Sequence, residues 1–149
     1  MTTVHTLVEF LAAPDKYTQA DLHGKNITDA DCQQIAVALR SANQLTELYL
    51  YQNQIGDAGA RALGQGLAAN TSLYALFLDN NQIGDAGAMA IAESLKSNKP
   101  SLIYLSFQIN YIGEATVAQI KNMLLHVERI NSSYQRLPKQ KQGHGLVSL

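Results

Sequence analysis

Two adjacent 28-residue segments of this chain have closely similar sequences, and this repetition limits the possible folds more than any other feature. Residues 45–72 and 73–100 agree at 14 of 28 positions when one is aligned on the other. The longest unbroken match is NQIGDAGA, which occupies 53–60 and again 81–88. A repeat of this length is the signature of a solenoid, in which each unit packs against its neighbours.

Each unit predicts one strand followed by one helix. Leu48 and Leu50 alternate with polar or aromatic residues, as in a strand with one buried face. Leu63 and Leu67 are four residues apart, which places them on one face of a helix. Asp57 precedes this helical run, as Asp85 does in the next unit, so we expect both to cap their own helices.

The helical pattern recurs beyond these two units. Pairs of apolar residues stay in phase along the chain and predict five helices, at Leu7 and Leu11, Ile35 and Leu39, Leu63 and Leu67, Ile91 and Leu95, and Ile120 and Leu124. Strand patterns are recognisable in four units only. We therefore expect a single domain over 1–135, in which 17–127 form four repeats. Residues 1–16 would supply an N-terminal cap, a helix at Thr3–Ala13 without a strand, because solenoid ends need cover.

The C-terminal end is predicted to be helical as well. Apolar residues after Ile120 follow at intervals of one, three or four, so we expect a capping helix over 120–135. Residues 136–149 are basic, polar and without periodicity, and we expect a disordered tail.

The complete pattern, L-x-x-L-x-L-x-x-N-x-I-G followed by L-x-x-x-L, resembles the leucine-rich repeat. Its length resembles the 28-residue variety found in ribonuclease inhibitor and in sensor arms of innate-immune receptors. The resemblance covers 17–127 and implies an α/β right-handed solenoid, with a parallel sheet on the concave face, helices on the convex face and helical caps at both ends. It also implies that Asn53, Asn81 and Asn110 are buried and bond the backbone of neighbouring turns.

Composition argues against several classes of partner. Charged residues make up 15% of the chain and the net charge is −1, so no general attraction for nucleic acid or anionic membranes is expected. No apolar run approaches the ~20 residues of a membrane span. A single cysteine, Cys32, permits no internal disulfide, and no signal-peptide pattern is present, which together favour a cytoplasmic location.

The strand alternation predicts a binding face. Side chains opposite the leucines include a group of aromatic residues, and aromatic groups on a rigid sheet are typical of protein-binding hot spots. Strand propensity with cross-strand stacking would also place aromatic residues here. The C-terminal helix or tail would conceal them if it folded across the sheet. The predicted partner-binding residues are Asp21, His23, Glu47, Tyr49, Tyr51, Phe77, Asp79, Tyr104, Ser106 and Gln108.

The sequence predicts no enzyme, no cofactor and no metal site. His23 and Asp79 would lie two strands apart, about 10 Å, which is too far for a hydrogen bond. No serine or cysteine nucleophile joins them. Cys32 aligns with Ala60 and Ala88, so we expect a buried small residue. The histidines are scattered, and their spacing suits no metal.

We therefore expect a non-enzymatic protein-interaction module, a monomer or weak dimer, that binds a partner protein through its concave sheet. Short stand-alone repeat chains resemble effectors that intracellular bacteria inject, which would place the chain in a host cell's cytosol. One alternative is a structural or self-assembly module that dimerises through its solenoid ends. Another is nucleic-acid binding through the basic tail. A further possibility is that the acidic stripe of Asp29, Asp57, Asp85 and Glu114 attracts a basic partner.

Overall fold

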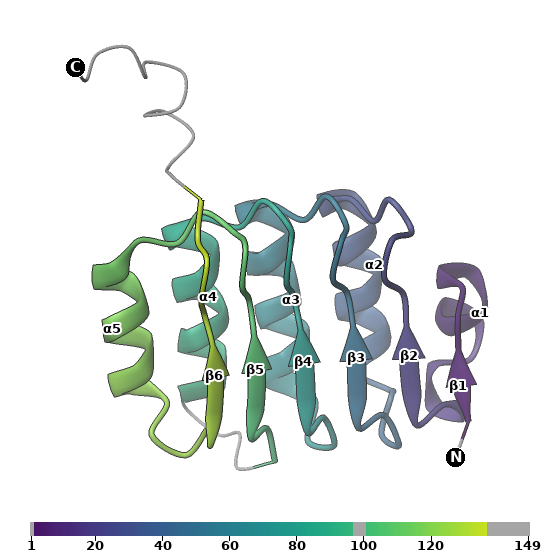
Figure 1. The fold of residues 1–149 in the computed structure, drawn as a ribbon. Helices are drawn as coiled ribbons and strands as arrows, with labels where there is room; N and C mark the ends of the chain where they lie inside the picture. The colour runs from purple at the N-terminus through teal and green to yellow at the C-terminus, as the bar shows by residue number, and fades with distance from the viewer. Residues whose placement is uncertain (1, 97–100, 137–149) are drawn as a thin grey trace.

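A single parallel sheet, backed on one side by a layer of helices, makes up the protein (Figure 1). The computed structural model describes residues 2–96 and 101–136. The six strands lie side by side in chain order: β1 Thr3–Val4, β2 Gln19–Asp21, β3 Glu47–Tyr49, β4 Ala75–Phe77, β5 Tyr104–Ser106 and β6 Arg129–Asn131. The helical segments are α1 Leu7–Ala12, the 3-10 turn η1 Pro14–Lys16, α2 Asp29–Leu39, α3 Asp57–Ala69, α4 Asp85–Lys96 and α5 Glu114–Met123. The predicted α/β solenoid is therefore confirmed.

Successive units stack in register. Leu48 of β3 pairs with Leu76 of β4, which pairs in turn with Leu105 of β5. A left-handed turn follows every strand from β2 to β6. It falls at Gly24, Gln52, Asn80, Ile109 and Tyr134, with φ between 55° and 63°. Four of these five residues are not glycine, so the surrounding unit holds a conformation that side chains ordinarily avoid.

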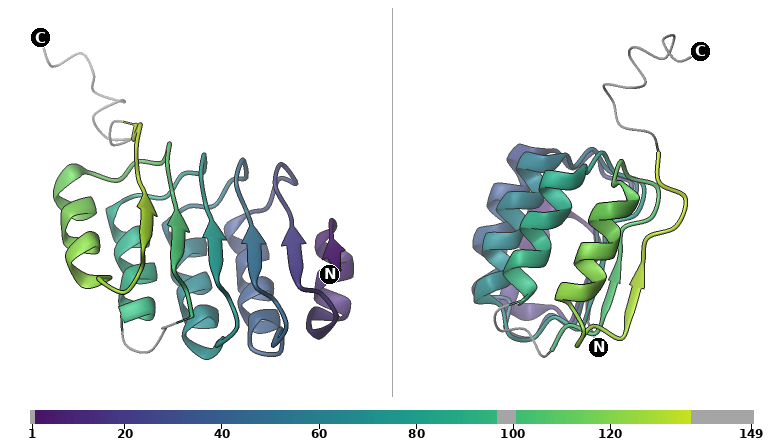
Figure 2. Two further views of the ribbon diagram at one scale, coloured as in Figure 1. Left: turned by 60° about the horizontal axis from the view of Figure 1, so that its bottom comes forward. Right: turned by 90° about the vertical axis from the view of Figure 1, so that its left-hand side faces the viewer.

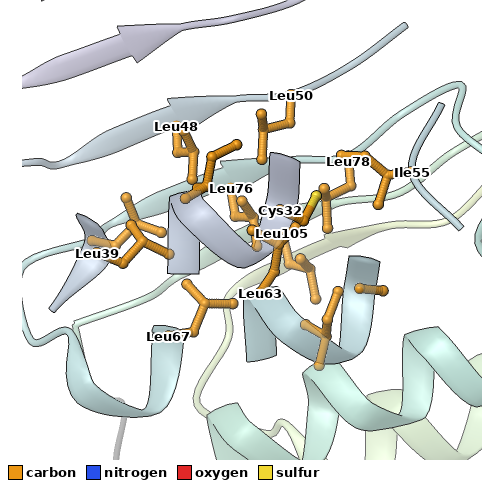
Figure 3. Packing of buried hydrophobic residues seen from close by; sticks show 14 of the residues in the cluster. Cys32, Leu39, Leu48, Leu50, Ile55, Leu63, Leu67, Leu76, Leu78 and Leu105 are labelled. Atoms are coloured by element: carbon orange, nitrogen blue, oxygen red, sulfur yellow. The ribbon is translucent and has the colours of Figure 1, made fainter. Parts of the chain in front are cut away.

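The core lies between the sheet and the helices. Leu48 and Leu50 from β3 and the turn after it meet Leu63 and Leu67 of α3, and all four are fully or almost fully buried (Figure 3). Burying each such side chain stabilises the fold by about 1.5–3 kcal/mol. Because the leucines occupy every second position in the strand, the intervening side chains face the opposite side of the sheet.

Buried asparagines join each unit to the one before it. The Asn81 amide nitrogen donates to the carbonyl oxygens of Leu50 and Leu78, at 2.9 and 3.1 Å, and its oxygen accepts from the Ile55 N–H. Asn53 and Asn110 make equivalent bonds in the neighbouring units. The role that the resemblance implied for these three residues is thus present in the structure, and every amide satisfies buried backbone groups of two turns.

Asp57 and Asp85 were predicted to cap their own helices, and this prediction is wrong. Asp57 is the first residue of α3, and its carboxylate accepts from the Gly84 and Gly87 N–H groups at the start of α4, at 2.7 and 3.0 Å. Asp85 likewise accepts from the Gly113 N–H, at 2.7 Å. Each aspartate therefore caps the helix of the next unit. In α3 the N-cap position belongs to Gly56, and Asp57 follows it as the first helical residue.

The N-terminal prediction is partly wrong. A helix is present at Leu7–Ala12, but β1 precedes it and pairs in parallel with β2, where no strand was expected. Residues 14–16 form a 3-10 turn. A two-residue strand carries too little alternation to be recognised, although Val4 is buried as a strand residue should be.

The capping helix predicted over 120–135 is wrong. Helix α5 ends at Met123, and β6 pairs in parallel with β5, placing Ile130 beside Leu105. The spacing between Val127 and Ile130 is three residues, which suits a helix but equally matches Leu45 to Leu48 at the start of a repeat. The interval from Leu105 to Ile130 is 130 − 105 = 25 residues, so this last unit is shortened and falls out of phase.

The last two described residues, Gln135 and Arg136, bond to preceding repeat units. Arg136, at the start of the predicted tail, donates to the Asn81 carbonyl oxygen at 2.8 Å and to the Asn80 side chain. Gln135 takes the place of the repeat asparagine and bonds the Asn110 and Ile112 N–H groups. The rest of that predicted tail, 137–149, lies outside the described residues.

Small residues allow the helices to pack closely. A Cβ atom added at Gly66 of α3 would lie 2.6 Å from the Ala36 carbonyl oxygen and 2.7 Å from its Cα, both backbone atoms of α2. Figure 2 shows the helices side by side along one face of the sheet. Within the described part of the chain, no helix has the length and apolar character that crossing a bilayer requires.

We predict that Gly66→Ala lowers stability by about 1–3 kcal/mol, because overpacking against α2 outweighs the gain in helix propensity of about 1 kcal/mol. Urea unfolding followed by circular dichroism measures the change. Ala68→Gly, at an exposed position of the same helix, is the matched control and should cost about 1 kcal/mol. A stabilised Gly66→Ala variant would contradict the close packing.

Candidate partner-binding face

The helices cover only one side of the sheet, and no other described element covers the second side (Figures 1 and 2). We call this second side the open face. Strand pairing aligns its side chains in rows, one of which runs Gln19, Glu47, Ala75, Tyr104 and Arg129, and the next Asp21, Tyr49, Phe77, Ser106 and Asn131. A third row, His23, Tyr51, Asp79 and Gln108, lies just beyond the strands, where backbone hydrogen bonds continue the pairing.

Five rings on the open face contact one another in an unbroken series. Tyr49 stacks on Phe77 with ring centres 4.7 Å apart, and Phe77 meets Tyr104 at 5.1 Å. On the other side, Tyr49 meets Tyr51 edge to face at 6.5 Å, and Tyr51 stacks on His23 at 4.6 Å. We call these five residues the aromatic ladder. It brings together all four aromatic residues of the predicted binding set, from neighbouring strands and the turns that follow them.

The rings of the ladder are partly buried by one another and partly exposed to solvent. All five residues have intermediate exposure, whereas the leucines on the other side of the sheet are almost completely buried. Aromatic pairs in these geometries contribute about 0.5–1.5 kcal/mol beyond their area burial. The ladder is therefore held in place before any partner arrives, and part of each ring is available for contact.

Tyr49 is the central ring of the ladder, and the pKa of its hydroxyl group is raised. Its hydroxyl donates to the Glu47 carboxylate. Burial, followed by this hydrogen bond and the negative charge of Glu47, raises the pKa of Tyr49 to about 12. The phenol therefore stays neutral at all physiological pH values, and its proton remains committed to Glu47.

Three carboxylates of the predicted set surround the ladder. Asp21 accepts from the His23 Nδ1 at 2.6 Å, and Glu47 accepts from Tyr49. Asp79 accepts from the Ser106 hydroxyl at 2.5 Å and from the Gln108 N–H at 2.7 Å. These bonds orient each carboxylate with respect to the rings.

One predicted residue, Ser106, differs from expectation in its exposure. Ser106 lies in the correct row but is buried, with 3% of its surface exposed, so it supports Asp79 and is not available to a partner. Strand alternation alone does not reveal this burial. Gln108 has intermediate exposure, and its backbone, rather than its amide, makes the bond to Asp79.

The sequence reasoning missed the residues that β6 adds to the face, Arg129 and Asn131. The Arg129 guanidinium lies over the Tyr104 ring, 5.6 Å from its centre. Arg129 belongs to β6, a segment that the helical interpretation placed elsewhere. Val127 and Ile130 have the spacing of the first two leucines of a repeat, and this pattern could have identified the strand that carries Arg129.

The described residues include one cysteine, Cys32, and several potential metal ligands among the histidine, aspartate and glutamate side chains. Cys32 is buried in the core, as expected, and desolvation raises the pKa of its thiol to about 12. A thiol in this state is a poor nucleophile. Among residues 2–96 and 101–136, no three histidine, cysteine, aspartate or glutamate side chains converge as metal ligands do.

Comparison with known proteins identifies the repeat and the fold. Residues 42–64 and 69–92 match the family model described as leucine-rich repeat. The structure resembles the actin-binding site 2 of leiomodin-1, with a TM-score of 0.75 and 22% identity, over 95% of this chain and 86% of the other. It also resembles the tropomodulin C-terminal domain of Caenorhabditis elegans, with a TM-score of 0.72 and 15% identity, over 86% and 81% of the two chains. No curated protein sequence matches. The chain thus has the fold of a leucine-rich repeat solenoid.

We predict that Glu47→Gln lowers the pKa of Tyr49, because the negative charge that opposes phenolate formation is removed, while burial keeps the pKa above its ordinary value of 10.0. Absorbance at 295 nm, as the difference between each protein and its Tyr49→Phe counterpart, follows this single ionisation. Because the raised pKa belongs to the folded state only, stability should decline as the pH rises from about 10 towards 12. An unchanged or higher pKa in Glu47→Gln would contradict the contact.

Proposed function

We propose that this leucine-rich repeat solenoid is a non-enzymatic interaction module that captures a partner protein on its open face, the side that the resemblance implies is concave. The observation that carries the proposal is the aromatic ladder, a continuous series of half-exposed rings on a side of the sheet that no other described element covers. Binding hot spots are enriched in tyrosine and lie near the centre of an interface.

Rigidity supports this function. The ladder stands on strands whose register is fixed by buried asparagines, so a partner would meet side chains that are already ordered. Binding then costs less side-chain entropy than it would on a mobile surface. Strand propensity alone accounts for aromatic residues in strands, but it gives no reason for the ladder to continue through Tyr51 and His23, which follow the strands.

Several finer assignments belong to the proposal. The length of the repeat favours the ribonuclease-inhibitor-like variety, and the resemblance to short repeat effectors favours a role in host cytosol. The single buried Cys32 is compatible with a reducing compartment. Leiomodin-1 matches through a segment described as an actin-binding site, so actin is a defined candidate for the binding test.

Dimerisation through the solenoid ends is the second candidate function. Exposed apolar side chains favour it at both ends: Val8 of α1 is 79% exposed, and Leu125 and Tyr134 near β6 are 83% and 81% exposed. Strands β1 and β6 also lie at the two edges of the sheet, where pairing with another chain is available. Light scattering separates the candidates, because a self-associating module elutes well above the monomer mass of 16.2 kDa.

We predict that replacing Tyr49 and Phe77 together by Ala abolishes partner capture. Purified protein is used to retain partners from candidate host lysates and, separately, purified actin, and retained proteins are quantified by mass spectrometry. Because the two rings stack, the double variant should also lose about 1–3 kcal/mol of stability, rather than the negligible loss expected for freely exposed rings. Leu50→Ala, in the core, should lower the free energy of unfolding by about 2–5 kcal/mol. Under conditions in which this variant is folded, it should still capture the partner.

The matched control removes exposed apolar side chains elsewhere. Val37 on α2 and Leu125 after α5 are 68% and 83% exposed, and replacing both by Ala should leave capture unchanged. Capture that survives in the Tyr49 and Phe77 variant but is lost in this control would move the site from the open face to the helices and the solenoid end.

A further inference from the structure

We infer that the partner segment recognised by the open face is cationic, and that it presents an arginine guanidinium to the stacked rings of Tyr49 and Phe77. This inference rests on the proposed function and names the chemistry of its partner. Two independent features of the face lead to it: carboxylates that form no ion pair with a lysine or arginine among the described residues, and an aromatic ladder whose last ring, Tyr104, already accepts a guanidinium group.

The charge on the open face is predominantly negative. Asp21, Glu47 and Asp79 border the ladder, and in the described ranges none of them forms an ion pair with a lysine or arginine. Asp21 lies near two histidines, at 2.6 Å from His23 and 3.9 Å from His5. The arginine of the face, Arg129, lies at the far edge on β6. A partner with positive charge would therefore gain attraction that the folded chain itself does not provide.

The carboxylates are placed on both sides of the central rings. Glu47 precedes Tyr49 by two residues on β3, and Asp79 follows Phe77 by two residues after β4. Two residues of extended chain span about 7 Å, so a group resting on the stacked rings lies within side-chain reach of both carboxylates. Each carboxylate has about four acceptor sites, and the hydrogen bonds from Tyr49, Ser106 and Gln108 occupy only some of them.

Two arginine side chains of this protein already stack on tyrosine rings. Arg129 lies over Tyr104, the last ring of the ladder, at 5.6 Å, and Arg136 lies over Tyr111 at 5.3 Å. Arginine is the cation suited to such a place, because its planar group stacks on a ring while its five N–H donors reach carboxylates in the same plane. Lysine would supply charge without the stacking, and phosphate groups would be repelled.

The test uses three blocked peptides of equal length, in which glycine alternates with arginine, with lysine or with glutamate, and measures their affinity by fluorescence anisotropy at 50 and 200 mM salt. We expect the arginine peptide to bind wild-type protein most tightly and more weakly at higher salt, the lysine peptide to bind at least about 3-fold more weakly, and the glutamate peptide not to bind.

Charge-removing variants localise the binding. Glu47→Gln with Asp79→Asn keeps the size of both side chains and one acceptor oxygen on each, and removes both negative charges. It should weaken binding of the arginine peptide by about 3- to 10-fold. Glu93→Gln with Glu114→Gln, at exposed positions on α4 and α5, changes the net charge equally and should have no effect. Equal loss in both variants, or equal affinity for arginine and lysine peptides, would overturn the inference, as would absence of binding by the arginine peptide.

The two proposals fail in different ways. Partner capture that requires Tyr49 and Phe77, but is unchanged by the Glu47 and Asp79 substitutions, would overturn the cationic partner and leave the open-face function intact. Capture that is independent of the two rings would overturn the proposed function itself.

Discussion

The buried asparagine amide is the interaction on which the rest of this structure depends. Asn53, Asn81 and Asn110 each lie between two turns, donating to a carbonyl oxygen in the preceding unit and accepting a backbone N–H there as well. A turn at this depth has no water to satisfy its polar groups, and leaving one unpaired costs about 1–3 kcal/mol. One asparagine amide per unit satisfies these buried backbone groups. The turns of successive units are therefore aligned, and the strands pair in a fixed register.

The same principle operates on the opposite side of the solenoid. The aspartate that begins one helix bonds the N-terminal N–H groups of the next, and Asn70 bonds the Leu39 and Ala42 carbonyl oxygens of the unit before it. Polar side chains thus bridge consecutive units at three levels, while leucines fill the space between them. Because these contacts determine the register, the side chains at the outward positions of the strands are not needed to set it. The aromatic ladder occupies such positions and continues into the turns that follow them.

Sequence alone predicted the parts of the molecule in which the period is intact. Leu48, Leu76 and Leu105 repeat at intervals of 28 and 29 residues, and the strands, helices and core derived from this period are confirmed. The rows of the open face followed directly, because alternation fixes which side chains share a side. The binding role of those rows stays a prediction.

The errors arose where local spacing is ambiguous or where contacts are not local. Val127 and Ile130 fit a helix and a repeat equally well, and only pairing with β5 decides between them. The destination of the Asp57 carboxylate depends on the distance to a helix thirty residues away, between Asp57 and Gly87, which no sequence pattern encodes. The burial of Ser106 is likewise not visible in the strand alternation. Secondary-structure propensity and sequence periodicity describe a single repeat unit. The pairing of β6, the contact of Asp57 and the burial of Ser106 depend instead on contacts between units.

The most direct test of the asparagine's role is native-state hydrogen exchange at the Ile55 amide in Asn81→Ala, with exposed Asn43→Ala as control. If the amide holds adjacent units together, exchange at Ile55 should accelerate by roughly 10- to 100-fold in Asn81→Ala, and stay at the wild-type rate in Asn43→Ala. An Ile55 amide that remains as protected in Asn81→Ala as in wild type would show that the units stack without this bond, and would contradict the central role of the asparagine.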